Sequence, residues 1–189
     1  MAELLRVQGY AATGIQQLAR TAGAPTGSIY HHFKGGKREV VAAALRQTGA
    51  VYIQLLPLLL DQHADLATGI EAAFATAADD VGHTGWANMC PVGTVTGEIA
   101  DVEPELREVA AGVIASWVDE GTRYLASRGL SDADARAVTY AVLSALEGGF
   151  LLARGQRSAE PLLAAGRAIS TYVATLPVTA PASAENQST

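Results

Sequence analysis

The chain contains few of the residues that stabilise secreted or metal-binding proteins. It has one cysteine among 189 residues, so no intrachain disulfide can form and a reducing compartment, the cytoplasm, is expected. That residue, Cys90, precedes a proline; it fits a small buried apolar group, and a redox role is the alternative. His63 and His83 are isolated from other ligand-type residues in the sequence. We therefore expect no metal and no cofactor.

Long apolar runs and catalytic groupings are missing as well. The most apolar stretch, residues 51–60, is interrupted by a glutamine and a proline and is too short to span a bilayer. The first residues lack the charged-then-apolar layout of a signal peptide. The acidic pairs, Asp79–Asp80 and Asp132/Asp134, resemble exposed charges or the start of a helix rather than a catalytic pair. The sequence thus predicts a protein that is neither membrane-bound nor an enzyme.

The charges are divided unequally along the chain. The formal net charge is −6, which alone argues against a nucleic-acid partner. Residues 1–46, however, carry six basic against two acidic side chains, whereas the remainder carries seven arginines against seventeen acids. A basic head on an acidic body concentrates positive potential where DNA phosphates would lie and repels DNA elsewhere. The alternative is a solvated charge asymmetry without function.

Residues 13–33 predict two short helices joined by a tight turn. The first spans residues 15–21 with Thr13 as its N-cap, and Gly23 supplies the positive φ that ends it. Pro25 suits the entry of the second helix. A helix, a tight turn and a second helix form the geometry that seats the second helix in the major groove of DNA. Five apolar side chains fit as the small core of this unit: Ile15, Leu18, Ala19, Ile29 and Phe33.

The rest of the chain is predicted to be helical, which gives an all-α fold. Apolar residues recur at helical spacing in six further segments, several of which begin at a proline, serine or aspartate: residues 37–57, 65–80, 91–100, 104 onward, 131–154 and 160–176. Residues 81–89 are expected to be irregular. We divide the chain into a helix-turn-helix DNA-binding domain of three helices, a helical ligand-binding and dimerisation domain, and a disordered tail: residues 1–48, 49–176 and 177–189.

The helix-turn-helix segment resembles the TetR family of transcriptional regulators. The matching positions are Gly9-Tyr10, Thr13, Ile15, Leu18-Ala19, Ala22-Gly23, Gly27-Ser28, Ile29-Tyr30, His31-His32-Phe33 and Lys37. The resemblance implies an all-α dimer whose N-terminal domain reads double-stranded operator DNA and whose larger C-terminal domain binds a small effector. The family has a longer first helix. Only eight residues precede Gly9 here, so some phosphate contacts would be missing.

Nine residues are expected to contact DNA: Thr13, Gln16, Gln17, Thr26, Gly27, Ser28, Tyr30, His31 and Lys37. Gly27 lets the backbone approach the groove because it has no Cβ. The hydroxyls of Thr26 and Ser28 can meet base edges, although they discriminate bases weakly. Lys37 stands near a helix N-terminus, which is suited to phosphate. Thr13 is expected mainly to cap its helix.

The body resembles one branch of the family, the LmrA/YxaF-like regulators. The residues that carry this second resemblance are Cys90-Pro91-Val92-Gly93, Glu98 and Leu146-Glu147-Gly148-Gly149-Phe150-Leu151-Leu152-Ala153-Arg154. It implies repression of efflux or detoxification genes, relieved by aromatic small molecules. Six bulky side chains are candidates for the effector pocket, with a purely structural core role as the alternative: Phe74, Trp86, Met89, Trp117, Tyr124 and Phe150. Trp117 and Tyr124 are predicted to form one stacking wall.

The last two predicted helices, residues 131–154 and 160–176, are expected to pair with their copies in a homodimer. A two-fold axis is needed if two heads are to read a pseudo-palindromic site; packing within one chain is the alternative use of these helices. We hypothesise a repressor whose effector shifts the helix at 37–57 and so releases the operator. The alternative is a degenerate family member that binds a ligand or a protein partner without specific DNA binding.

Overall fold

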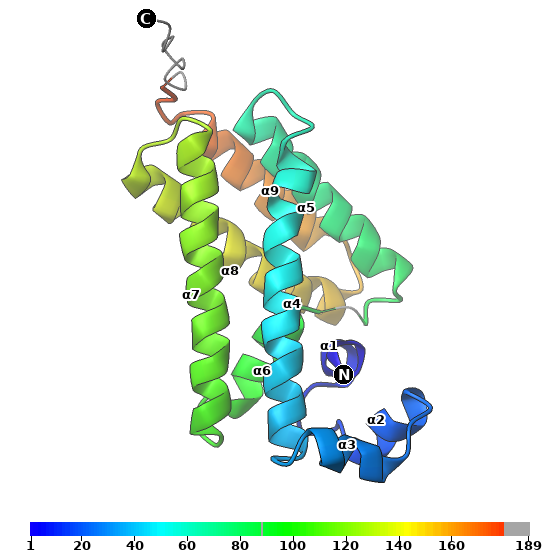
Figure 1. The fold of residues 1–189 in the computed structure, drawn as a ribbon. Coiled ribbons are helices and arrows are strands. Elements are labelled where there is room, and N and C mark those ends of the chain that lie inside the picture. Colours follow the sequence, from blue (N-terminus) through cyan, green and yellow to red (C-terminus); the bar gives the residue numbers. More distant parts are fainter. Residues whose placement is uncertain (88, 180–189) are drawn as a thin grey trace, which may run out of the picture.

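The computed structural model describes residues 1–87 and 89–179, and every regular element in them is an α-helix (Figure 1). The all-α prediction is confirmed. In chain order the helices are α1 (Ala2–Gln8), α2 (Ile15–Thr21), α3 (Thr26–His32), α4 (Lys37–Leu60), α5 (Leu66–His83), α6 (Pro91–Ile99), α7 (Pro104–Ser127), α8 (Asp132–Gln156) and α9 (Glu160–Val173). Figure 1 shows α2 and α3 at one end of the molecule and α5 and α9 at the other, with α4 and α7 side by side between them.

The helices α2 and α3 form the predicted helix-turn-helix. Ile15, Ala19 and Ile29 are buried together, and Val40 from the first turns of α4 completes this small core. The turn between the helices contains Gly23 at φ +62°, the left-handed conformation that the sequence predicts. The head is thus a packed unit that shares its core with α4.

One local prediction in the head is wrong. Thr13 does not cap α2, whose N-cap is Gly14 and has no side-chain hydrogen bond. The Thr13 hydroxyl instead donates to the backbone oxygen of Gly9 at 2.6 Å, and Thr13 is only 1% exposed. Thr13 therefore closes the loop between α1 and α2 from the inside.

Helix α4 runs without interruption from the head into the body. It continues past its predicted end at Pro57 to Leu60, because Pro57 lies in the last turn, where it removes a single backbone hydrogen bond. Arg128, which follows the last residue of α7, secures this end: its guanidinium donates to the oxygens of Leu60 (3.3 Å) and His63 (2.9 Å) and pairs with Asp61. The far end of α4 is consequently fixed to the body.

The starts of the body helices match their sequence signals. The side chains of Asp65 and Ser131 accept hydrogen bonds from backbone N–H groups at the starts of α5 and α8, and prolines occupy the first positions of α6 and α7. Two ends differ from the prediction. α5 extends to His83 because Val81 is fully buried in the core, and α9 ends at Val173, where the chain tightens into a turn.

The predicted disordered tail, residues 177–189, is described only as far as residue 179. There the backbone N–H of Thr179 donates to the oxygen of Gly129 at 2.9 Å, so this part of the tail lies against the turn between α7 and α8. Residues 180–189 lie outside the described residues. The predicted boundary at residue 48 falls inside α4, where Thr48 and Gly49 are both buried.

Helix α8 carries an exposed apolar surface. It packs on α7 and α9, yet Leu151 is 62% exposed, Leu152 is 52% exposed and Tyr140 is also exposed. By length and composition alone it is the one described helix that could cross a membrane. Exposed apolar surfaces of this kind often mark sites of contact with another protein.

Candidate DNA interface and effector cavity

Helix α3 presents a polar, exposed surface at the tip of the head. Tyr30 is 52% exposed and His31 is exposed, while Thr26 and Ser28 are half-buried. A Cβ placed on Gly27 would meet no atom within 4 Å, so the backbone there is open to approach. These five residues are those predicted to contact DNA from the recognition helix. Gly27 and His31 lie on the side of α3 opposite the buried Ile29, whereas Thr26, three residues before Ile29, lies nearer the buried side.

The four predicted contacts outside α3 differ in how they are placed. Gln16 is exposed on α2, and Lys37 is the first residue of α4, with its ammonium 4.1 Å from the centre of the Tyr10 ring. Gln17 forms two amide hydrogen bonds with Gln8, at 2.7 and 3.0 Å. Gln17 is therefore occupied inside the head, as is Thr13 in its buried loop contact.

A carboxylate of α6 holds the loop between α1 and α2. Glu98 accepts the backbone N–H groups of Tyr10 (3.1 Å) and Ala11 (2.7 Å). A Cβ on Gly9 would overlap the Glu98 carboxylate, and Gly9 has φ +77°, so this position requires glycine on both counts. The head is thereby connected to the body through α6 as well as through α4.

The residue that precedes α7 adds a further connection. Glu103 accepts from the Tyr10 hydroxyl at 3.1 Å and pairs with Arg38 of α4 at 2.8 Å. Partial burial and the hydrogen bond to Glu103 raise the pKa of Tyr10, so the phenol keeps the proton that it donates. Two body residues, Glu98 and Glu103, thus contact the head at Tyr10.

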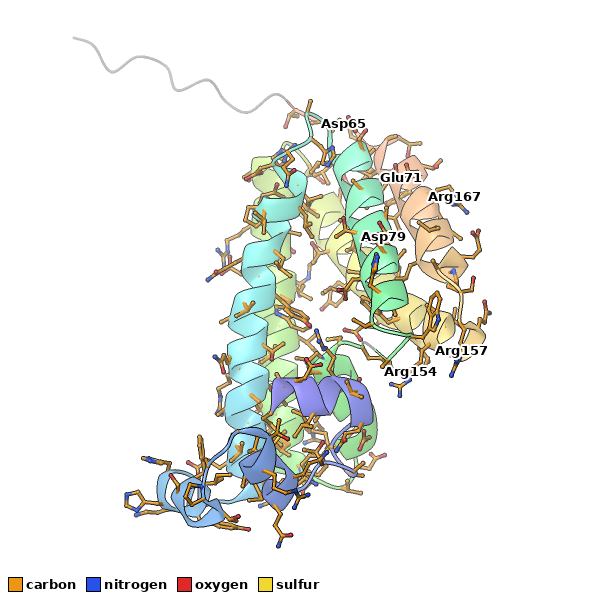
Figure 2. The ribbon with its side chains drawn as sticks, turned by 90° about the vertical axis from the view of Figure 1, so that its right-hand side faces the viewer. Asp65, Glu71, Asp79, Arg154, Arg157 and Arg167 are labelled. Atoms are coloured by element: carbon orange, nitrogen blue, oxygen red, sulfur yellow. The ribbon has the colours of Figure 1, made fainter. Side chains whose placement is uncertain are left out.

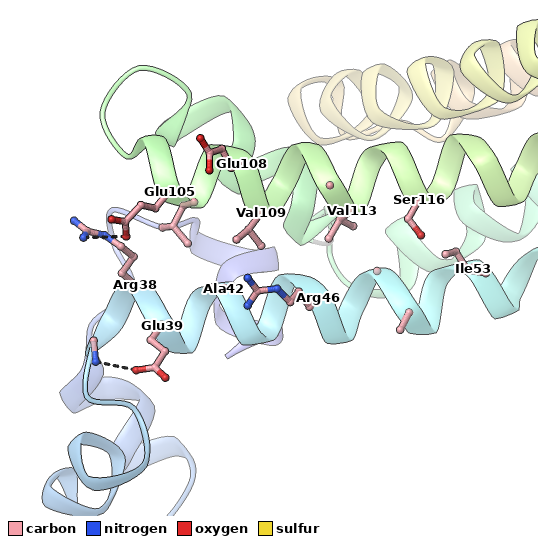
Figure 3. A pocket seen from close by; sticks show the side chains of 15 residues that line it. Arg38, Glu39, Ala42, Arg46, Ile53, Glu105, Glu108, Val109, Val113 and Ser116 are labelled. Carbon is pink, nitrogen blue, oxygen red and sulfur yellow. Dashed lines mark hydrogen bonds and ion pairs between the residues drawn. The ribbon is translucent and has the colours of Figure 1, made fainter.

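An open groove of about 890 Å³ follows α4 and α7 beside this joint (Figure 3). Arg38 and Glu105 pair across it at 3.5 Å, and Glu39 accepts the backbone N–H of Gly35 at 2.8 Å. Arg46 and Val109 line it farther along. Because the groove is open and its charged rim already links head to body, it is part of the joint rather than a closed pocket for a small molecule.

A more enclosed cavity of about 500 Å³ lies in the body between α4, α5, α7 and α8. Each helix contributes apolar side chains, such as Leu59 of α4, Ile70 of α5, Leu125 of α7 and Leu146 of α8. Small-molecule sites have volumes of about 300–1,000 Å³ and are mostly apolar with a few polar groups. This cavity has the size and lining of such a site.

Four of the six bulky residues predicted for the pocket line this cavity: Phe74, Met89, Trp117 and Phe150. Trp86 and Tyr124 are not among the described lining residues. Trp86 lies in the turn after α5 at φ +66° and packs against the core cluster of the body. Tyr124 donates its hydroxyl to Asp61 at 2.6 Å.

The predicted stacking wall of Trp117 and Tyr124 is therefore wrong. They lie seven positions apart, about 10 Å along the helix, and of the two only Trp117 lines the cavity. Trp117 stacks instead on Tyr52 of α4, with ring centroids 5.9 Å apart, and donates its indole N–H to Gly49 at 2.9 Å. The aromatic wall joins α4 to α7.

Sequence reasoning also missed several polar members of the lining, among them Arg6, Tyr52 and Glu147. Arg6 belongs to the head by sequence, and Glu147 looks like a surface charge on α8. The only sequence signal was the resemblance motif, which includes Glu147 without giving it a role. Arg6 reaches the cavity because α1 lies across the lower end of the body, as Figures 1 and 2 show. Tyr52 and Glu147 come from α4 and α8.

Glu147 faces the N-terminal end of α6. A Cβ on Gly93 would overlap its carboxylate, so the absent side chain makes room for it. Burial raises the pKa of Glu147, partly offset by a hydrogen bond from the Cys90 thiol. Burial and the Glu147 carboxyl in turn raise the pKa of Cys90, which is 6% exposed. A thiol held in its protonated form is a poor redox switch.

The acidic residues predicted to be surface charges lie on helix exteriors. Asp79 is exposed on α5 (Figure 2), and Asp132 is exposed at the start of α8. Asp80 is exposed as well, but it also lines the cavity. In residues 1–87 and 89–179, no group of three or more histidine, cysteine, aspartate or glutamate side chains is arranged to hold a metal ion.

Two family models match this chain. The model described as bacterial regulatory proteins, tetR family, matches residues 2–44, and the model described as transcriptional regulator LmrA/YxaF-like, C-terminal domain, matches residues 67–168. The chain belongs to the TetR family of transcriptional regulators, in its LmrA/YxaF-like branch. It is a DNA-binding transcriptional regulator, and both families consist of regulators rather than enzymes.

Individual relatives agree with this assignment. The chain is 32% identical over 160 residues to the uncharacterized HTH-type transcriptional regulator YxaF of Bacillus subtilis, covering 85% of this chain and 84% of YxaF. It is 29% identical over 160 residues to the regulator LmrA of the same organism, covering 85% of each. A regulatory protein TetR from Rhodobacter sphaeroides superposes with a TM-score of 0.77 at 22% identity, covering 90% of this chain and 93% of that one, and shows the shared fold.

The residues that carried the branch resemblance meet in space. Cys90 and Gly93 lie against Glu147 at one end of α6, beside the cavity, and Glu98 lies near the other end against the head. The motif therefore covers α6, which contacts the cavity at its start and the head at its end, and the part of α8 that carries Glu147.

Proposed function

We propose that this TetR-family regulator is a dimeric repressor, and that a small, largely apolar effector releases it from its operator. The observation that carries the proposal is the cavity of about 500 Å³ whose wall includes α4, the helix that begins in the head. An effector in the cavity contacts the same rigid helix that fixes the recognition helix in place. Its binding and operator binding are then coupled.

The required coupling is small. A 100-fold loss of operator affinity corresponds to about 2.7 kcal/mol of difference in effector binding between the two states. The effector achieves this if it fits the cavity only when α4 or α6 has moved. Since α4 is fixed to the body at Asp61 by Arg128, movement is expected at the head end.

For the dimer we propose the exposed apolar side of α8 together with α9. Leu151, Leu152 and Tyr172 are exposed there in the single chain. Two recognition helices must lie about 34–36 Å apart, or a multiple of this, to enter successive major grooves. A regulator of operator DNA acts where the bacterial chromosome is, so we place the protein in the cytoplasm.

The test is binding of the purified protein to the DNA immediately upstream of its own gene, compared with random DNA of equal length across a salt series. We expect a preference for the upstream DNA that persists as salt rises, while binding to random DNA weakens steeply. Tyr30→Ala, on the exposed side of α3, should remove most of the preference.

Equal and weak binding to both DNAs would contradict the repressor proposal. It would favour instead a member that binds a ligand or a protein partner without specific DNA binding.

A further inference from the structure

Arg6 is a residue of the head that lines the cavity of the body. It follows the fully buried Leu5 on α1, and its side chain is 28% exposed. Its Nη2 pairs with Glu3 on the same helix at 2.6 Å. Its Nε–H is buried and has no hydrogen-bond acceptor among the described residues. A buried donor without a partner is uncommon in native proteins and costs stability.

Helix α1 is held in this position by contacts on several sides. Leu5 packs in the core cluster with Val41 and Leu45 of α4 and Val92 of α6. Arg154 near the end of α8 donates to the oxygen of Val7 at 3.2 Å. Arg6 therefore lies at the cavity because the head itself is packed there, and it cannot leave without moving α1.

The polar groups beside Arg6 are compatible with an oxygen that carries negative charge. Tyr52 lies close enough for the Arg6 guanidinium to lower the pKa of its phenol, although burial, the larger effect, raises it. Glu147 and Cys90 are the other buried ionisable groups of the described lining, and burial favours the neutral form of each. Asp80 is an exposed acid of the same lining. Glu120, at the cavity edge, pairs with Arg123. Arg6 is thus the cation of the lining.

We propose that the effector carries an anionic or strongly hydrogen-bond-accepting oxygen, that this oxygen accepts from Arg6, and that the effector thereby contacts the DNA-reading head directly. The apolar part of the effector lies against Tyr52, Trp117 and the leucines of the wall. This inference rests on the proposed function for its regulatory consequence. The binding chemistry itself does not depend on DNA.

The experiment uses two dyes that share an apolar skeleton. 8-Anilinonaphthalene-1-sulfonate carries an anionic sulfonate, whereas N-phenyl-1-naphthylamine is uncharged. Each dye is titrated by fluorescence into the full chain and into Arg6→Met, which keeps the apolar stem and removes the donors. Arg20→Met is the matched control, because Arg20 is an exposed arginine of the head that does not line the cavity. Melting curves establish that each variant is folded.

We expect Arg6→Met to weaken binding of the sulfonate dye about tenfold or more and to leave the uncharged dye unaffected. Arg20→Met should change neither dye, and Arg6→Lys should recover part of the loss because it restores the charge. Ala77→Phe, which fills the cavity from α5, should weaken both dyes. Equal sulfonate binding by Arg6→Met and Arg20→Met, or undiminished binding by Ala77→Phe, would overturn the proposal.

A second readout separates this inference from the proposed function. The sulfonate dye is added to the complex of the full chain with upstream DNA, and release is compared with that of Arg6→Met, each relative to its own affinity without dye. Release that depends on Arg6 supports contact between effector and head. Dye binding through Arg6 without release would overturn the regulatory half of the inference. Failure to bind upstream DNA at all would contradict the repressor function, while the dye titrations would still decide the role of Arg6.

Discussion

Gly93 lies where the first turn of α6 meets the carboxyl group of Glu147. Gly93→Ala introduces a methyl group that overlaps this carboxylate, and we expect it to lower the free energy of unfolding by about 1–3 kcal/mol. Gly97→Ala on the same helix is the matched control. Its methyl group meets no atom within 4 Å and should stabilise the helix by up to about 1 kcal/mol. Urea denaturation measures both.

The overlap also predicts that substitutions at Gly93 and Glu147 have non-additive effects on the free energy of unfolding. In the double variant Gly93→Ala/Glu147→Ala the obstacle is gone, so most of the stability lost by Gly93→Ala should return. If the double variant loses as much free energy of unfolding as the two single variants together, or more, the contact between Gly93 and Glu147 does not determine packing here.

Glu147 also predicts a pH dependence. Burial raises its pKa in the folded state above the ordinary value of 4.5, so the folded protein binds this proton more tightly than the unfolded chain. Its contribution to stability is therefore complete below the unfolded pKa and is lost as the pH rises through the folded pKa. Glu147→Gln should flatten the stability curve above pH 4.5 and be at least as stable as the original chain at neutral pH. The exposed Glu71→Gln is the control. A steeper curve for Glu147→Gln would contradict the assignment.

At the scale of an element, α6 connects the cavity to the head by contacting both. Its carboxylate Glu98 accepts two backbone N–H groups of the loop between α1 and α2, and hydrogen bonds to a charged group are worth about 1.5–3 kcal/mol each. Glu98→Gln places an amide donor against these donors. We expect faster hydrogen exchange at Tyr10 and Ala11 and an operator affinity at least about tenfold lower.

Asp101→Asn is the control for this prediction, because Asp101 is an exposed acid two residues beyond the end of α6. It should change neither hydrogen exchange nor operator affinity. Unchanged exchange in Glu98→Gln would mean that the loop is held by other contacts, such as the hydrogen bond between Tyr10 and Glu103.

The helices are predictable from the sequence wherever a local signal marks them. Pro91 and Pro104 place the starts of α6 and α7, and Ser131 places that of α8, since a capping group or a missing N–H acts within one turn. The ends are less predictable. Burial of Val81 extends α5 by a turn, and this depends on what packs against it rather than on neighbours in sequence.

The cavity is predictable only in part, for the same reason. Phe74 and Trp117 are bulky and line it, but Tyr124 is as bulky and turns toward Asp61. Arg6 and Glu147 lie 141 positions apart and share one cavity because α1 packs beneath the body. Periodicity within one helix indicates which face is buried. It does not indicate which of the buried faces leave a space between them.

At the scale of the whole molecule, the charge asymmetry and the exposed apolar side of α8 predict the same assembly. The basic head needs a partner copy to read two half-sites, and Leu151 and Leu152, at 62% and 52% exposure, offer the surface for it. We expect sedimentation to show a dimer, and Leu151→Glu/Leu152→Glu to give a folded monomer, because two carboxylates per chain would be buried across the axis.

The consequence for DNA follows from the linkage of the two heads. In a dimer, binding of one head raises the effective concentration of the other head at its half-site. A monomer contacts one half-site only and lacks this effect, so its operator affinity should fall by about 10²-fold or more. Leu58→Glu, on the exposed side of α4 at 62% exposure, is the matched control and should stay a dimer with full affinity. If Leu58→Glu dissociates the dimer while Leu151→Glu/Leu152→Glu does not, the two-fold axis passes along α4. The heads would then be related through the helix that also lines the effector cavity, and dimerisation itself would become sensitive to the effector.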